Sequence, residues 1–321
     1  MRAGAALVIA LTFLVATSAE SASSAERRIS GATAMRACAG ADPYWPTMTL
    51  ALRGTTAWIA CKQQARLVRV DLARARTTGQ VRLPGTPVAV AMGFGSLWSL
   101  DGSTLYRLDE RTGRMKRRIV LGATAPYNIW IGGGSVWVAD DQGAQVLRIS
   151  PATNAVVARI PVGDRPADMA FSGRRAWVID HRDRTLVRVD LATNDTTRLA
   201  TVGSDAPERL VYLAGSLWVT GRGTPLLQVD PESGTVMRSI DIGGTGIDVV
   251  ASAGDLWIPV RTAKVDRTGL PTMTAVRRVT TAGKVSTVAV ARGRVDVHGL
   301  AASGRTVWLA DNTDGFVYRL R

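Results

Sequence analysis

Side chains capable of specific chemistry occur at two adjacent positions before each of seven regularly spaced tryptophans. The tryptophans are Trp58, Trp98, Trp137, Trp177, Trp218, Trp257 and Trp308. Nine residues before them stand Thr49, Ala89, Asn128, Asp168, Arg209, Asp248 and Gly299, and ten residues before them Met48, Val88, Tyr127, Ala167, Glu208, Ile247 and His298. Copies that agree elsewhere differ here in charge and size, as expected of side chains that face a ligand. The candidate binding residues are therefore Tyr127, Asn128, Asp168, Glu208, Arg209, Asp248 and His298.

Two kinds of function are open to these residues. Without a cofactor, they could bind a small molecule, a cell-envelope polymer or a protein partner. Alternatively, Asp168, Asp248 and Glu208 could hold a divalent cation and support a metal-assisted lyase or lactone hydrolase. The sequence contains no His-Glu-x-x-His, Gly-x-Ser-x-Gly or paired-cysteine metal motif, which favours the non-catalytic binding or scaffold role.

A second position, three residues after each tryptophan, carries four aspartates. Its residues are Cys61, Asp101, Asp140, Asp180, Gly221, Val260 and Asp311. A ring of carboxylates could bind a cation or an amine, whereas one aspartate in each copy could instead cap the turn that follows. We favour the interpretation as a turn cap.

The repeating unit must place both sets of residues. Successive tryptophans are 39 to 41 residues apart, except for the last two, which are 51 apart. Each copy has four short runs rich in β-branched and aromatic residues, which predict antiparallel strands a to d; in the fourth copy they cover residues 169–171, 176–179, 186–189 and 197–202. An Asp or Ser followed four residues later by Gly or Asn predicts the c–d turn. Because one such sheet cannot bury both faces alone, seven copies predict an all-β, seven-bladed β-propeller with the tryptophans between blades.

The ends of the chain predict how the ring closes. The seventh copy supplies only strands a to c, so the outer strand d of that blade should come from within residues 28–38. Cys61 would then lie at a b–c turn and Cys38 near a d–a connection. Both connections occupy the same face of a meander, so we expect a Cys38–Cys61 disulfide.

The third copy carries a resemblance to a known family. Its residues are Val136-Trp137-Val138-Ala139-Asp140, followed by Val146-Leu147-Arg148-Ile149-Ser150-Pro151-Ala152-Thr153-Asn154. They resemble the YVTN-type β-propeller repeat, and the chain is also similar to the propeller of streptogramin lyases. The resemblance implies an exported or surface protein with a ring of blades, but no single activity. In such lyases a histidine near the start of an inner strand takes part in catalysis, and His298 stands at such a position. The resemblance is only partial, because the strand around each tryptophan differs from the corresponding strand of the lyases.

The N-terminus and the charge bear on location and partners. A basic start followed by a short apolar run predicts a signal peptide over residues 1–25 and one mature domain over residues 26–321. Cleavage before Glu20 and retention of the run as an N-terminal anchor are the alternatives. We expect a monomer that is exported to the periplasm, the cell envelope or the medium, with no transmembrane span. The net charge is +14, but the arginines are spread over all copies without a run, which disfavours nucleic acid as a partner. Residues 260–272 predict a longer loop on the face of the b–c turns.

Overall fold

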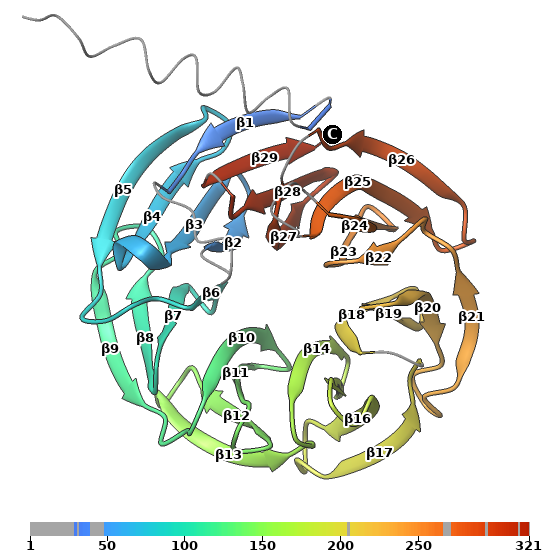
Figure 1. The fold of residues 1–321 in the computed structure, drawn as a ribbon. Coiled ribbons are helices and arrows are strands. Elements are labelled where there is room, and N and C mark those ends of the chain that lie inside the picture. Colours follow the sequence, from blue (N-terminus) through green and yellow to red (C-terminus); the bar gives the residue numbers. More distant parts are fainter. Residues whose placement is uncertain are drawn as a thin grey trace, which may run out of the picture.

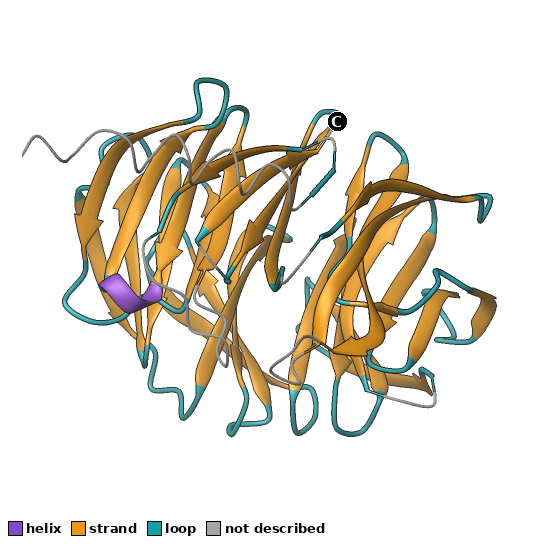
Figure 2. Ribbon diagram, turned by 45° about the horizontal axis from the view of Figure 1, so that its top comes forward, coloured by secondary structure: helices purple, strands orange, loops and turns teal. Residues whose placement is uncertain are grey.

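The fold is a ring of seven antiparallel sheets, as predicted from the repeats (Figures 1 and 2). The computed structural model describes residues 29–30, 32–38, 48–203, 206–265, 271–292, 295–313 and 315–320. The predicted signal peptide lies outside these residues. In the described part of the chain the one helix is the short η1 (Lys62–Gln64), and no helix there is long and apolar enough to cross a membrane.

Each blade has strands a to d, counted outward from the central axis. Blade 1 contains β2 (Met48–Arg53), β3 (Thr56–Cys61), β4 (Arg66–Asp71) and β5 (Arg76–Arg82), and blade 2 contains β6 (Ala89–Gly93), β7 (Ser96–Asp101), β8 (Thr104–Asp109) and β9 (Met115–Val120). Blade 3 contains β10 (Pro126–Gly132), β11 (Ser135–Asp140), β12 (Gln145–Ser150) and β13 (Ala155–Pro161). Blade 4 contains β14 (Pro166–Ser172), β15 (Arg175–Asp180), β16 (Thr185–Asp190) and β17 (Thr196–Thr201).

The remaining three blades complete the circle. Blade 5 contains β18 (Pro207–Leu213), β19 (Ser216–Gly221), β20 (Thr224–Val229) and β21 (Val236–Ile240). Blade 6 contains β22 (Thr245–Gly246), β23 (Val250–Ser252), β24 (Asp255–Val265), β25 (Pro271–Thr280) and β26 (Val285–Val290). Blade 7 contains β27 (Val297–Ser303), β28 (Thr306–Asp311), β29 (Phe316–Leu320) and the N-terminal β1 (Thr33–Arg36). The face that carries the b–c turns and the d–a connections is called the funnel face below.

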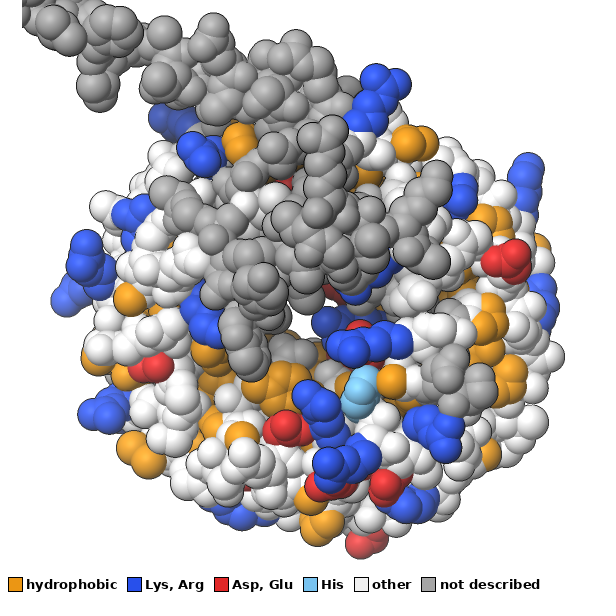
Figure 3. All heavy atoms as spheres, in the orientation of Figure 1, with side chains coloured by type: hydrophobic (Ala, Val, Ile, Leu, Met, Phe, Trp, Pro, Cys, Tyr) orange, Lys and Arg blue, Asp and Glu red, His pale blue; other side chains and the backbone are white. Residues whose placement is uncertain are grey.

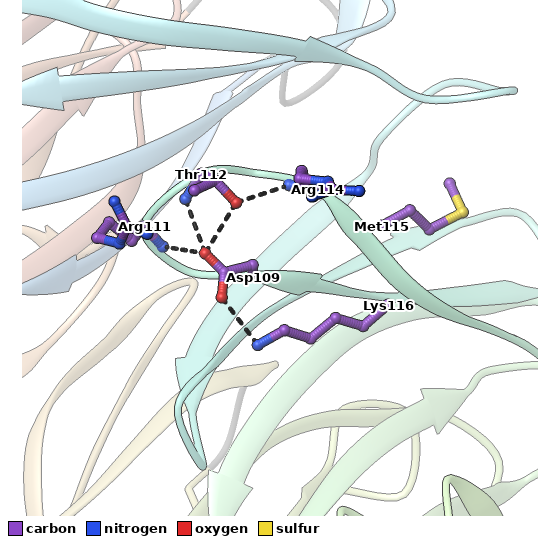
Figure 4. A pocket seen from close by; sticks show the side chains of 6 residues that line it. All are labelled: Asp109, Arg111, Thr112, Arg114, Met115 and Lys116. Carbon is purple, nitrogen blue, oxygen red and sulfur yellow. Dashed lines mark hydrogen bonds and ion pairs between the residues drawn. The ribbon is translucent and has the colours of Figure 1, made fainter.

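The c–d turns on the opposite face have the predicted geometry. In blade 2 the amide of Gly113 donates to the carbonyl of Asp109 (2.8 Å), and Gly113 has the left-handed φ of +74°. Figure 4 shows the Asp109 carboxylate accepting hydrogen bonds from this turn, including one from the Thr112 amide at 2.9 Å, and pairing with Lys116 at 3.0 Å. The Lys116 ammonium and the Thr112 donors hold the pKa of Asp109 below its usual range. The carboxylate is therefore satisfied within its own turn.

Seven hydrophobic clusters hold the ring together, one at each interface between blades. Each cluster combines buried side chains from two neighbouring blades, and the tryptophan of strand b lies in it. All seven tryptophans are at most 5% exposed, which confirms that they pack between blades. Trp177 also donates from Nε1 to the carbonyl of Pro231 in the next blade (2.8 Å).

Arginines on strand c reinforce the same interfaces. Arg148 lies opposite Trp137 in the register of β11 and β12, and its guanidinium stacks 5.4 Å from the tryptophan ring. Its Nη1 donates to the carbonyl of Leu191 (2.7 Å) and to Asn194 Oδ1 (2.8 Å), both in the c–d turn of blade 4. Arg107 of blade 2 makes the equivalent contacts with blade 3. Part of the high arginine content therefore serves blade packing.

The N-terminal strand closes the ring. β1 pairs antiparallel with β29, with Thr33 opposite Arg319, which confirms the predicted source of the outer strand of blade 7. The predicted disulfide between Cys38 and Cys61 is present and joins this strand to blade 1 (Cα–Cα 5.6 Å). Over its separation of 23 residues, a crosslink contributes about 3 kcal/mol by the loop-entropy estimate.

Blades 6 and 7 depart from the repeat. Because β1 comes from the N-terminus, no c–d turn links it to β29. Arg278 of blade 6 therefore has no such turn in the next blade to bond, and it pairs with Asp255 of its own blade (Nη2–Oδ2 2.5 Å). A cavity of about 510 Å³ lies beside this pair. The insertion predicted as a loop instead lengthens the β24–β25 hairpin as far as the Val265–Pro271 pair; residues 266–270 lie outside the described residues.

Candidate ligand-binding site

A cavity of about 580 Å³ opens on the funnel face beside the central axis. Its walls come from the inner strands and the b–c turns of blades 1 to 5: Lys62, Val88, Ala125, Pro126, Tyr127, Asp141, Arg165, Ala167, His181, Glu208, Arg209 and Arg222. Figure 3 shows basic and acidic side chains and a histidine gathered on this side of the central opening. Of the seven candidate residues, Tyr127, Glu208 and Arg209 line the cavity together.

Arg209 on β18 is the charge at the inner end of the cavity. Its Nε lies 3.5 Å from Asp248 Oδ1, and its side chain is 28% exposed. Burial lowers the pKa of an arginine, but the carboxylates of Asp248, Asp168 and Glu208 outweigh it, and the pKa of Arg209 is raised. Arg209 therefore stays cationic, with two of its counterions behind the wall of the cavity.

Asp168 on β14 joins the inner strands of three blades. Its Oδ1 accepts hydrogen bonds from Trp130 Nε1 (2.7 Å) and from the amide of Met169 (2.8 Å), and its Oδ2 accepts one from the amide of Leu210 (2.9 Å). Burial raises the pKa of Asp168 to about 6, although the charge of Arg209 and the bond from Leu210 oppose the shift. This geometry makes Asp168 a positioning residue for blade 5, and it does not line the cavity.

Glu208 and Tyr127 both line the cavity. Glu208 Oε1 pairs with Arg222 Nε at 2.8 Å, and the Arg222 side chain is 76% exposed. The hydroxyl of Tyr127 donates to the carbonyl of Pro166, which fixes the ring across the gap between blades 3 and 4. Burial and the nearby Asp141 carboxylate raise the pKa of Tyr127, so the phenol is neutral.

The three other candidate residues lie elsewhere on the inner strands. Asn128 Oδ1 accepts a hydrogen bond from the amide of Ile129 (2.9 Å), and Asp248 Oδ1 accepts one from the amide of Val249 (2.8 Å). Both side chains thus complete the backbone where strand a is irregular. His298 lies on β27, and its side chain is outside the described residues.

Sequence reasoning missed the outer wall of the cavity. Lys62, Asp141, His181 and Arg222 all stand four residues after a tryptophan, one position beyond the aspartates, and Arg165 stands in a d–a connection. These residues differ between copies as the inner-strand residues do. The same comparison of copies, extended by one position, would have found them.

The aspartates three residues after the tryptophans are structural. Asp140 Oδ1 accepts hydrogen bonds from the amides of Thr124 (2.9 Å) and Ala125 (2.8 Å), which lie in the preceding d–a connection. Burial raises the pKa of Asp140, but these amides and the Gln145 side chain outweigh it and lower the pKa. Asp180, Asp101 and Asp311 accept similar bonds from backbone amides. The predicted cap of the following turn is present at Asp180 and Asp311, whereas the amides that bond Asp140 and Asp101 lie in the preceding d–a connection.

The carboxylates proposed for a divalent cation do not form a joint donor set. Asp168 receives three hydrogen bonds, Asp248 pairs with Arg209, and Glu208 pairs with Arg222. Among the described residues, no group of three or more His, Cys, Asp or Glu side chains is arranged to hold a metal ion. These residues do not fit the cation that the alternative enzyme would need.

Comparisons with known proteins support the fold. No family profile and no curated protein matches the chain. Among solved structures, selenomethionine-substituted virginiamycin B lyase from Staphylococcus aureus is 17% identical with a TM-score of 0.73, over 91% of this chain and 99% of that chain. BBS1N in complex with ARL6DN is 17% identical with a TM-score of 0.68, over 88% and 93%. BamB from Moraxella catarrhalis is 14% identical with a TM-score of 0.61, over 85% and 83%. The chain thus shares the β-propeller architecture of proteins with different functions.

Proposed function

We propose that this chain is an exported, monomeric binding propeller of the YVTN-type repeat class, which holds its ligand in the cavity of the funnel face. The main support for the proposal is that side chains of different chemical types, from five blades, line one cavity of about 580 Å³. This volume falls in the range of small-molecule sites. Its lining combines apolar side chains with charged groups that can fix the orientation of a ligand.

Two further observations support this proposal. A disulfide such as Cys38–Cys61 is typical of proteins in oxidising compartments, in agreement with removal of residues 1–25 and a mature domain over residues 26–321. Among the similar structures, a virginiamycin B lyase is recorded with Quinupristin and BBS1N with ARL6DN, so propellers of this shape are known with a small-molecule ligand and with a protein partner. N-terminal sequencing of the secreted chain tests the processing.

Retention of a small molecule tests the binding role. The wild-type protein, purified from its native extracellular or envelope fraction, should carry a small molecule detectable by native mass spectrometry. Arg222→Glu, at the mouth of the cavity, should lose it. Arg182→Glu is the matched control, because Arg182 is an equally exposed b–c turn arginine, paired with Asp164, that does not line the cavity. Absence of any retained molecule, or equal loss in both variants, would refute the proposal.

A further inference from the structure

The cavity is lined by apolar side chains and by charged side chains. Val88, Ala125, Pro126 and Ala167, from the inner strands of blades 2 to 4 and the residues leading into them, form an apolar surface. The ring of Tyr127, 37% exposed, extends it. The b–c turns, the d–a connection at Arg165 and blade 5 supply the charged groups. A ligand that matches both kinds of lining needs an apolar body and a charged head.

The cavity has more cationic than anionic lining groups. Lys62, Arg165, Arg209 and Arg222 line it, against the two carboxylates Asp141 and Glu208, so the surface that faces a ligand carries two net positive charges. Asp248 lies behind Arg209 and does not line the cavity. Asp168 and Asp248 offset the charge of Arg209 from behind the wall. The remaining lining cations Lys62, Arg165 and Arg222 still outnumber the two lining carboxylates, which favours an anion.

The ion pairs at the mouth leave donors for a ligand. Arg222 is 76% exposed and uses Nε toward Glu208, and Arg165 is 57% exposed with its Nε 3.5 Å from Asp141. Exposed pairs of this kind contribute little to stability, and a guanidinium has five N–H donors. An anionic head can thus add bonds to these arginines without breaking the fold.

Resting on the proposed function, we propose that the ligand is an amphipathic anion: an aromatic or aliphatic body that contacts Tyr127 and the apolar wall, and one carboxylate or phosphate held by Arg222 and Arg209. A cationic ligand is disfavoured because the four cations that line the cavity outnumber its two carboxylates, Asp141 and Glu208. A long polyanion is also disfavoured, because arginines such as Arg148 and Arg107 are engaged between blades.

A set of isosteric probes tests this assignment by ligand-observed NMR. Naphthoate and naphthyl phosphate should bind, naphthamide should bind about tenfold more weakly because it lacks the charge, and naphthylmethylamine should not bind. Acetate and inorganic phosphate, which lack the apolar body, should also bind at least about tenfold more weakly. The ratio of naphthoate to naphthyl phosphate affinity identifies the head group.

Variants connect the signal to the cavity. Arg222→Ala should weaken naphthoate binding about tenfold, while Arg182→Ala should leave it unchanged. Equal binding of naphthoate and naphthamide, or equal losses in both variants, would overturn the proposal. If none of the anionic probes binds while the native protein still retains a molecule that depends on Arg222, the assignment of ligand class fails and the binding role stands. If no molecule is retained either, both fail.

Discussion

Arg148 joins blade 3 to blade 4, and its replacement by alanine measures what this repeated contact contributes. The side chain donates from Nη1 to Leu191 and Asn194, donates from Nε to Ser135 Oγ (2.9 Å), and stacks on Trp137. Hydrogen bonds from a charged donor contribute about 1.5–3 kcal/mol, and a cation–π contact about 0.5–1 kcal/mol. Because one group makes all these contacts, Arg148→Ala should lower the free energy of unfolding by about 2–4 kcal/mol.

Two comparisons give this measurement its meaning. Blade 5 carries Gln228 at the equivalent position, bonded to Ser216 Oγ at 2.9 Å, so Arg148→Gln should keep the bond to Ser135 and cost less than alanine. Arg117 is an exposed arginine on β9 whose side chain has no hydrogen bond or ion pair among the described residues, and Arg117→Ala should change stability by less than about 0.5 kcal/mol. Urea denaturation of the three variants decides the matter. If Arg148→Ala costs no more than Arg117→Ala, the structural explanation of the arginine content is wrong.

Two further predictions concern closure and the buried charge. The double variant Cys38→Ala with Cys61→Ala should lose about 3 kcal/mol in denaturation experiments and should match the reduced wild type; an unchanged midpoint would show that the crosslink does not hold the closure. Asp168 faces Arg209, Asp248 and, at longer range, Tyr127. Its folded pKa of about 6 lies above the value of 3.8 for a free side chain, so its contribution to stability is complete below about pH 4 and is lost as the pH rises through 6. Relative to Asp168→Asn, the wild type should therefore lose up to about 3 kcal/mol between pH 4 and pH 7, and a relative gain over this range would contradict the shift.

The fold was predictable because each level of the sequence points to the same structure. Tryptophans at a period near 40 residues, four β-rich runs per copy and a left-handed residue in each c–d turn all require a ring of small sheets. The partner of β29 followed from counting strands, and the Cys38–Cys61 pair followed from that closure. The extended β24–β25 hairpin was missed, because an insertion rich in turn residues does not reveal whether its ends pair.

The site was predictable only in part, because position on a strand does not fix where a side chain points. Tyr127, Glu208 and Arg209 face the cavity, whereas Asn128 bonds to the adjacent backbone at an irregular point of its strand. Asp168 turns toward Trp130 and Leu210 of neighbouring blades, a contact over about 40 residues that no local pattern encodes. Lys62 and Arg222 were missed because they stand one position beyond Cys61 and Gly221, the last residues of each turn that were compared between copies.

The most direct test of the proposed binding mode is a crystal structure of the protein with naphthoate. We expect electron density for the naphthyl group against Tyr127 and Ala167, with the carboxylate within hydrogen-bonding distance of Arg222 or Arg209. Density for naphthoate in the cavity beside Arg278 between blades 6 and 7 would contradict it. So would an empty funnel cavity at a naphthoate concentration that saturates the NMR signal.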